Sequence, residues 1–338
     1  MLIGPGRACD RPATSGSEQC AAAATTDSLT FQVKPVPPFR LDLTVWALRR
    51  RAANAIDRWD GATWRRVLVV DGHAQGIEVA QITPPDRPML RVTVSGRAPC
   101  AKSAVTAPLT RMLGLDRRLT DFYRVAADDP DLGRLAEALK GLKPPRFPTL
   151  FETLVNAFAC QQVTLSLGIL LLNRLAEAYA RGLDGPGGRV FAFPSPDDLA
   201  ACEPDQLRAL GFSRQKAQAI IELARAVAQD GLDLEVLEQV DDATAAERLQ
   251  GLRGVGRWTA EYVLLRGLGR LHVFPGDDVG ARNNLQRWLG FLEPLDYEGV
   301  RRALAQWAPF QGLVYLHLLL NSLQLEPRGT GQLDQKLR

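Results

Sequence analysis

Two adjacent acids, Asp277 and Asp278, are the residues of this chain whose position most suggests chemistry. They follow a Pro-Gly turn and open a predicted helix. One acid at such a place commonly caps the helix by accepting hydrogen bonds from its first backbone N–H groups. Because one cap needs only one carboxylate, we assign the cap to Asp277. Asp278 is then expected to face a cleft, where it could stabilise positive charge or orient a water molecule.

A glycine-rich turn joins two predicted helices over residues 249–260. Gly254 and Gly256 lack Cβ atoms, so the backbone can approach a ligand closely, and Val255 between them is expected to be a buried anchor. Amides at the following helix N-terminus form an anion site that suits a DNA phosphate. The alternative is a plain helix–helix turn that binds nothing.

The turn and the two acids together carry a family resemblance. The runs 252–262 and 273–278 resemble the helix-hairpin-helix, Gly/Pro-rich loop and aspartate signature of DNA glycosylases. Within that superfamily the chain is similar to 3-methyladenine DNA glycosylase II, the AlkA type, over about residues 30–325. The segment ahead of the helices resembles that family's N-terminal domain, and residues 157–164 resemble its loop that enters the duplex. The implied partner is damaged double-stranded DNA.

The resemblance implies roles for residues of the substrate pocket. Asp278 matches the family's catalytic aspartate. Trp258 and Tyr262, which lie four residues apart on one helical face, match pocket aromatics, although ordinary core packing would also explain them. Leu319 stands where the family often has a further aromatic, and only leucines are found around it. The resemblance therefore implies a roomier, less electron-rich wall on that side.

The resemblance also implies a DNA-contacting set and a cation site. Gln162 matches the side chain that is wedged into the gap left by a flipped base. The backbone carbonyls of Gln250, Leu252 and Val255 match a site for a monovalent cation, Na+ or K+, that helps to hold a phosphate. The residues expected to contact DNA are Gln161, Gln162, Gly254, Val255, Gly256 and Thr259.

The chemistry expected from these matches is removal of an alkylated purine, such as 3-methyladenine or 7-methylguanine, to leave an abasic site. The nucleotide must be flipped out of the duplex, and damaged bases resist this least. Breaking the glycosidic bond puts positive charge on the sugar, which a carboxylate about 4 Å away would stabilise by about 4 kcal/mol. The alkylated base is itself cationic, so aromatic faces would attract it.

Two absences predict a monofunctional enzyme. Strand-cleaving relatives carry a lysine in the second hairpin helix to form a Schiff base. Here that position is Trp258, and the adjacent Arg257 cannot act as an amine nucleophile. No cysteine follows Cys202, so the four-cysteine iron–sulfur cluster of the endonuclease III-like branch is not expected, nor is another cofactor. The alternatives are a glycosylase for oxidised or deaminated bases and a non-catalytic DNA-binding protein with the same hairpin.

The organisation of the chain predicts an α+β N-terminal domain with an antiparallel sheet, followed by an all-α helix-hairpin-helix body. Within the first domain Arg40–Leu43 alternates like a strand and Trp46–Ala55 indicates a basic helix, while Phe151–Ala180 in the body indicates one long helix. The expected segments are a disordered leader over 1–28, the α+β domain over 29–112, the helical body over 113–326 and a tail over 327–338.

Composition permits this function without requiring it. The 338 residues are 46% hydrophobic and 23% charged, with a net charge of +3, so phosphate binding must come from local charge and backbone amides. Basic clusters such as Arg49–Arg51 and Arg65–Arg66 are expected to be mostly solvated. Because no apolar run reaches about 18 residues and no signal peptide is visible, we expect a cytoplasmic protein that binds no membrane. We also expect a monomer.

Overall fold

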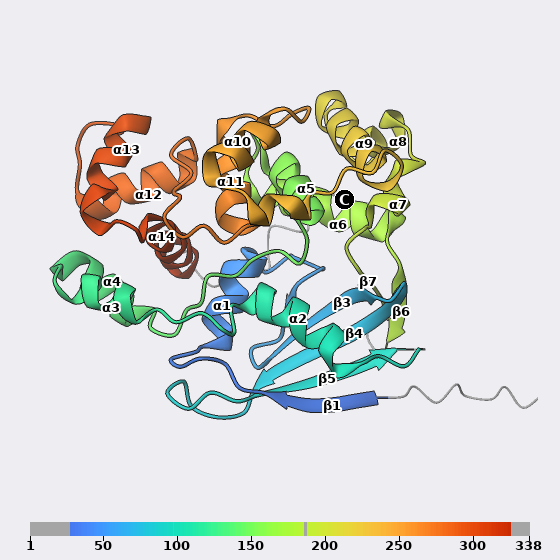
Figure 1. Ribbon diagram of the computed structural model, residues 1–338, viewed down its shortest axis with the longest axis horizontal. Coiled ribbons are helices and arrows are strands. Elements are labelled where there is room, and N and C mark those ends of the chain that lie inside the picture. Colours follow the sequence, from blue (N-terminus) through green and yellow to red (C-terminus); the bar gives the residue numbers. More distant parts are fainter. Residues whose placement is uncertain (1–27, 97, 186–187, 326–338) are drawn as a thin grey trace, which may run out of the picture.

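The computed structural model describes residues 28–96, 98–185 and 188–325. An antiparallel sheet lies on one side of the molecule and a body of helices lies on the other (Figure 1). The predicted fold class, an α+β N-terminal region followed by a helical body, is confirmed. The predicted leader, apart from Ser28, and the predicted tail lie outside the described residues.

The sheet has five strands in the order β1-β5-β4-β3-β2, and all neighbouring strands are antiparallel. Its hydrophobic face packs against two helices, α1 (Leu41–Arg49) and α2 (Lys102–Leu113). The Asp71-Gly72 turn joins the two longest strands, and both residues have positive φ. The strands are β1 (Ser28–Val33), β2 (Arg58–Trp59), β3 (Thr63–Val70), β4 (His73–Gln81) and β5 (Leu90–Gly96).

The helical body has two hydrophobic cores. One core is formed mainly by α5 to α11, and the other by α3, α4 and α12 to α14 together with α1. A small hairpin of β6 (Gly182–Gly185) and β7 (Gly188–Phe191) follows α6. The helices are α3 (Thr120–Ala127), α4 (Pro130–Ala138), α5 (Leu150–Cys160), α6 (Leu165–Tyr179), α7 (Pro196–Ala200), α8 (Pro204–Ala209), α9 (Arg214–Ala228), α10 (Asp242–Gln250), α11 (Arg257–Arg266), α12 (Val279–Leu289), α13 (Tyr297–Leu304) and α14 (Gln311–Leu325).

Helix α1 corrects two predicted elements. The segment predicted as a strand, Arg40–Leu43, leads into α1, because Leu41, Val45 and Leu48 fall on one helical face and are buried against the sheet. The helix predicted over Trp46–Ala55 ends at Arg49, where Arg50 adopts a left-handed conformation with φ 63°.

The predicted long helix Phe151–Ala180 is also wrong, because it is two helices with a break between α5 and α6. Gln162 at the break has φ 52°, which an α-helix cannot accommodate. Thr164 then caps α6 by accepting a hydrogen bond from Leu167 N at 3.3 Å. The break places a short polar loop at the surface next to the hairpin.

A buried ion cluster joins the sheet to the helical body. Arg66 on β3 donates to both carboxylate oxygens of Asp57, at 2.9 and 3.0 Å, and to both oxygens of Glu152 on α5, at 2.6 Å. All three residues are buried. Losing one member would leave an uncompensated charge in the interior, so the cluster fixes the sheet against α5.

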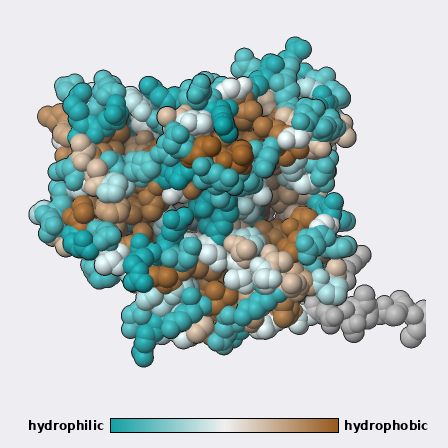
Figure 2. All heavy atoms as spheres, in the orientation of Figure 1, coloured by the Kyte–Doolittle hydropathy of each residue, from teal (hydrophilic) through white to brown (hydrophobic). Residues whose placement is uncertain are grey.

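The surface shows hydrophobic side chains in separate groups among hydrophilic ones (Figure 2). Among the described helices, none is both long and apolar enough to cross a membrane.

His317 on α14 is a buried titratable group in the second core. Its Nδ1 lies 2.7 Å from the carbonyl oxygen of Leu313, and its ring packs on Phe122 with centroids 5.0 Å apart. Burial lowers the pKa of His317 to about 4. The folded protein therefore holds His317 neutral at pH values where the unfolded chain would bind a proton.

This difference predicts an acid-dependent loss of stability. Because the folded pKa lies below the ordinary value of 6.5, the stabilisation is present above pH 6.5 and is lost as the pH falls toward 4. The loss should reach about 3 kcal/mol. His317→Asn retains a donor for Leu313 but does not titrate, so denaturant unfolding at pH 7 and pH 4 should show a smaller difference for this variant. The exposed His73→Asn should keep the wild-type difference, and equal behaviour of both variants would contradict the assignment.

Candidate active-site cleft and nucleic-acid interface

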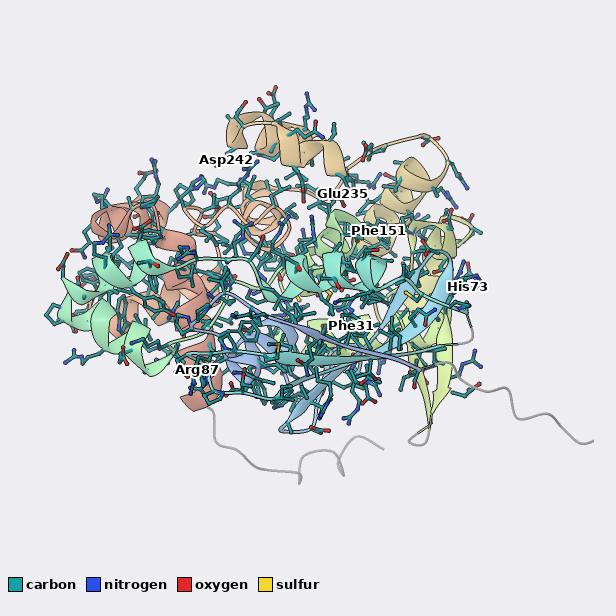
Figure 3. All side chains as sticks on the ribbon, turned by 60° about the horizontal axis from the view of Figure 1, so that its bottom comes forward. Phe31, His73, Arg87, Phe151, Glu235 and Asp242 are labelled. Atoms are coloured by element: carbon teal, nitrogen blue, oxygen red, sulfur yellow. The ribbon has the colours of Figure 1, made fainter. Side chains whose placement is uncertain are left out.

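The hairpin between α10 and α11 has the predicted geometry. Gly254 has φ 80°, a left-handed conformation that favours glycine, and Val255 is 8% exposed and packs into the core as an anchor. Asp242, labelled in Figure 3, starts α10 and pairs with Arg270, 3.2 Å away, and with His272, both of which follow α11. These pairs hold the two helices of the hairpin together.

The N-terminus of α11 is open to a ligand. Gly256 is its N-cap residue, and among the described residues no side chain caps this end. A Cβ built on Gly256 would meet nothing within 4 Å. The first backbone N–H groups of α11 thus lie uncapped at the positive end of the helix dipole, beside the space that a phosphate would need.

Asp278 is both the helix cap and the acid that faces the cleft. The prediction that Asp277 caps α12 is wrong: Asp278 Oδ1 accepts the hydrogen bond of Ala281 N at 2.9 Å, and Asp277 Oδ2 pairs with Arg257 Nε at 2.7 Å. Asp278 Oδ2 accepts from Trp258 Nε1 at 3.3 Å. Asp278 therefore performs both tasks. Its Oδ1 caps α12, and its Oδ2 bonds to Trp258 in the cleft.

Trp258 and Tyr262 lie on one face of α11, as predicted. Their rings stack with centroids 5.5 Å apart and an interplanar angle of 28°. Trp258 is half-buried and Tyr262 is buried. The structure places both rings in the cleft that contains Asp278.

A further aromatic, Tyr315, lies in the same cleft and corrects the prediction that the C-terminal helix offers only leucines there. Tyr315 on α14 donates its hydroxyl to Asp278 Oδ2 at 3.1 Å. It precedes Leu319, which is half-buried in the cleft wall, by one helical turn. This i, i+4 spacing could have revealed Tyr315. Burial raises the pKa of Tyr315 well above its ordinary value, and the charge of Asp278 raises it further, so the hydroxyl remains a donor.

The loop between α5 and α6 is attached to the hairpin. Gln161 Nε2 donates to the Gly254 carbonyl and to the hydroxyl of the buried Thr259, at 2.9 Å each. Lys216 Nζ donates to the Gln161 carbonyl at 2.6 Å. Gln162 is exposed. The structure therefore uses Gln161 and Thr259 to hold the loop and leaves the side chain of Gln162 at the surface.

Two arginines, Arg50 and Arg266, reach the cleft from inside the protein, and Arg50 departs from the expectation that its basic cluster is mostly solvated. Arg50 is buried and donates to Asn156 Oδ1 at 2.7 Å and to the Tyr262 hydroxyl at 3.1 Å. Arg266 is buried and donates to the Ala47 carbonyl at 3.0 Å, and burial lowers its pKa. Both guanidinium groups lie against the Phe147 ring. Through Arg50 the N-terminal region contributes to the same cleft as the helical body.

One cleft of about 1790 Å³ is lined by Asp278 together with Trp258, Tyr262, Tyr315 and Leu319. Its walls come from α11 and the hairpin on one side and from α12 and α14 on the other, which lie next to one another in Figure 1. The loop that contains Gln161 and Gln162 lines the same cleft, as do Gly254 and Gly256. The predicted loop, glycines, aromatics and carboxylate, which are spread over residues 161–278 of the sequence, are thus brought together. Among the described residues, no group of His, Cys, Asp and Glu side chains is arranged to hold a metal ion.

Comparison with protein families identifies two regions. Residues 155–310 match the model of the HhH-GPD superfamily base excision DNA repair protein, and residues 29–148 match the AlkA N-terminal domain. DNA-3-methyladenine glycosylase 2 of Escherichia coli is 30% identical over 282 residues, which cover 83% of this chain and 94% of that protein. DNA-3-methyladenine glycosylase of Bacillus subtilis is 34% identical over 172 residues, which cover 51% of this chain and 57% of that one.

Solved structures share the fold. The 3-methyladenine DNA glycosylase from Archaeoglobus fulgidus has a TM-score of 0.76 and 24% identity, covering 88% of this chain and 99% of that one. An 8-oxoguanine glycosylase/lyase of Clostridium acetobutylicum, solved in complex with double-stranded DNA, has a TM-score of 0.70 and 15% identity, covering 88% and 97%.

The two hairpin glycines are expected to differ in their effect on stability. Gly254→Ala places a Cβ in a left-handed conformation, 3.0 Å from the Cβ of Ala219, and should lower the free energy of unfolding by about 1–2 kcal/mol. Gly256→Ala is the matched control, because φ is −100° and the site is open, and it should change stability by less than about 1 kcal/mol. Denaturant unfolding measures both, and equal losses would contradict this view of the turn.

Proposed function

Because the chain belongs to the HhH-GPD superfamily of base excision DNA repair proteins, in the family of DNA-3-methyladenine glycosylase 2, we propose that it removes alkylated purines from double-stranded DNA. The enzyme hydrolyses the N-glycosidic bond of 3-methyladenine or 7-methylguanine nucleotides and leaves an abasic site. The observation that carries this proposal is the Asp278 carboxylate, which shares a cleft with the stacked Trp258 and Tyr262.

Asp278 supplies the charge that the reaction needs. As the glycosidic bond breaks, the sugar becomes positively charged and the electron pair leaves with the base. A carboxylate about 4 Å away, at an effective dielectric near 20, stabilises that charge by about 4 kcal/mol. This corresponds to about a thousandfold in rate. Because Oδ1 remains bound to Ala281 N, the carboxylate stays in place as the charge develops.

The wall of the cleft suits a flipped, cationic base. Purines alkylated at N3 or N7 carry a positive charge, and the electron-rich faces of Trp258 and Tyr262 attract it. Such bases leave without a general acid. The hairpin amides at Gly256 hold a phosphate, and the exposed Gln162 fills the gap that the flipped nucleotide leaves in the duplex.

A second candidate substrate class is a neutral damaged base. Arg50 and Arg266 carry buried positive charges in the same cleft, and both lack a carboxylate hydrogen-bond partner among the described residues. Nε and Nη1 of Arg266 are buried without a hydrogen-bond partner. A neutral base with a carbonyl group would avoid repulsion from these charges and could accept from such a donor. This observation favours the oxidised or deaminated bases as the alternative substrates.

We propose that the enzyme does not cleave the strand. The position of the Schiff-base lysine is occupied by Trp258. Lys216 is the lysine among the described residues that line the cleft, and its Nζ donates to the carbonyls of Ala159 and Gln161, at 3.1 and 2.6 Å. An amine held at the end of α5 by two carbonyls supports a structural role rather than a nucleophilic one.

The working form that we propose is a cytoplasmic monomer. All of the residues assigned to the cleft come from one chain, and a repair enzyme must share a compartment with the chromosome.

Release of free base tests the function directly. Duplex DNA methylated at purines should yield 3-methyladenine or 7-methylguanine, identified by mass spectrometry, and should show strand breaks only after alkali. DNA that contains hypoxanthine or 8-oxoguanine forms the parallel sample. Base release from the second sample alone would favour the neutral-base alternative, and breaks before alkali would contradict the monofunctional assignment. Binding without any base release would indicate a non-catalytic DNA-binding protein.

Asp278→Asn should lower the rate of base release by about a thousandfold while it preserves affinity for lesion-containing DNA. Asparagine retains the cap of α12, because its side-chain oxygen can still accept from Ala281 N, but it removes the charge. Asp277→Asn is the matched control and should lower the rate less than tenfold. Single-turnover kinetics and a binding titration measure both quantities, and a fully active Asp278→Asn protein would rule out this mechanism.

We also propose that a monovalent cation, Na+ or K+, supports the phosphate contact through the carbonyls of Gln250, Leu252 and Val255. Gln250 ends α10, where the last carbonyls lack intrahelical donors and carry the negative end of the helix dipole. The Leu252 carbonyl accepts from Val255 N at 3.2 Å, which leaves its second lone pair. Backbone carbonyl oxygens are a ligand type that a K+ ion accepts.

The cation proposal predicts weaker DNA binding when the ion is too large for the hairpin. Affinity for duplex DNA should fall several-fold when KCl or NaCl is replaced by tetramethylammonium chloride at equal ionic strength. Affinity that depends only on ionic strength would exclude a specific ion.

A further inference from the structure

Tyr315 is the buried group with the most direct contact to the proposed catalytic carboxylate. Its side chain is 5% exposed, and its hydroxyl donates to Asp278 Oδ2 at 3.1 Å. The edge of its ring meets the ring of Phe274, with centroids 5.4 Å apart and planes at 85°. Phe274 belongs to the loop that leads into Asp278. Tyr315 is therefore fixed by α14 on one side and by that loop on the other.

The hydrogen bonds of Asp278 show why this contact matters. The cap bond from Ala281 N holds only Oδ1, at 2.9 Å, and by itself it would let Oδ2 swing about that bond. Two donors hold Oδ2: Trp258 Nε1 at 3.3 Å and the Tyr315 hydroxyl at 3.1 Å. Trp258 is half-buried and forms the wall proposed to contact the base. Tyr315 is the donor that lies within the core.

We propose that Tyr315 is a positioning residue that holds Asp278 Oδ2 toward the sugar of the flipped nucleotide and keeps it there as a fixed negative charge. This inference rests on the proposed function. Three hydrogen bonds, from Ala281 N, Trp258 Nε1 and the Tyr315 hydroxyl, restrict rotation of the carboxylate and so fix where its charge lies. The glycosidic bond breaks heterolytically, its electron pair leaves with the base, and water adds to the sugar carbon and loses its proton to solvent. Tyr315 exchanges no proton in these steps.

Burial supports this role because it keeps the Tyr315 hydroxyl protonated. The pKa of Tyr315 is raised well above its ordinary value, first by burial and then by the charge of Asp278. The hydroxyl thus remains protonated and a hydrogen-bond donor at neutral pH. Hydrogen bonds to charged groups contribute more than neutral ones, and losing the one that holds Asp278 Oδ2 toward the sugar should lower the rate about ten- to a hundredfold.

The test is Tyr315→Phe, which removes the hydroxyl and keeps the ring against Phe274. The matched control is Tyr123→Phe, because the Tyr123 hydroxyl also makes one hydrogen bond, from Gly141 N at 3.0 Å, and lies outside the cleft. Single-turnover release of the methylated base, affinity for a duplex with an abasic-site analogue, and the thermal midpoint are measured for both variants and for the wild type.

The expected result is a rate ten- to a hundredfold lower for Tyr315→Phe, with affinity within twofold of wild type and a thermal midpoint close to that of Tyr123→Phe. Tyr123→Phe should release base at the wild-type rate. A wild-type rate for Tyr315→Phe would overturn the inference, and so would a loss of affinity as large as the loss of rate, since Tyr315 would then contact DNA rather than act through Asp278. A wild-type protein that releases no base would instead overturn the proposed function.

Discussion

The buried charge of Arg66 is the constraint on which the arrangement of this molecule depends. A guanidinium in the protein interior must be surrounded by acceptors, and Asp57 and Glu152 provide four carboxylate oxygens within 3.0 Å. Because Glu152 lies on α5, the pairing fixes the sheet against the helix that leads into the loop at Gln161. Arg50 of the N-terminal region reaches the Tyr262 hydroxyl across the same junction. The geometry of the cleft therefore depends on a contact outside it.

Within the cleft, one carboxylate links the fold to the proposed chemistry. The Asp278 side chain starts α12 with one oxygen and faces the cleft with the other. The helix N-terminus favours a negative charge, which is also what the proposed reaction needs, so the structural and the chemical requirement act in the same direction. Trp258 and Tyr315 come from two other helices and meet at the same oxygen. The position of the charge is thus set by three helices.

The proposed contact with DNA uses few charged side chains. The net charge of the chain is only +3. The uncapped amides at the start of α11 and the loop that Gln161 fastens to Gly254 offer positions for a phosphate and a duplex without a large basic surface. Contacts to phosphate groups do not depend on the base sequence. They therefore suit an enzyme that must find damaged bases at any site in the genome.

The sequence by itself determined the family, the fold class and the segments proposed to carry the chemistry. Gly254, Gly256, Trp258, Tyr262 and Asp278 are recognisable because their types and spacing follow from local rules of turns, caps and helical faces. Tertiary structure decided which acid caps α12, the break after Gln161 and the presence of Tyr315 beside Asp278. It also turned Arg50 and Arg66 inward, although the sequence places them in basic clusters that are usually solvated. The contacts of Arg50 with Tyr262, of Arg66 with Glu152 and of Tyr315 with Asp278 join residues more than 30 positions apart. Such contacts cannot be deduced from local periodicity, because burial and pairing are properties of the assembled core.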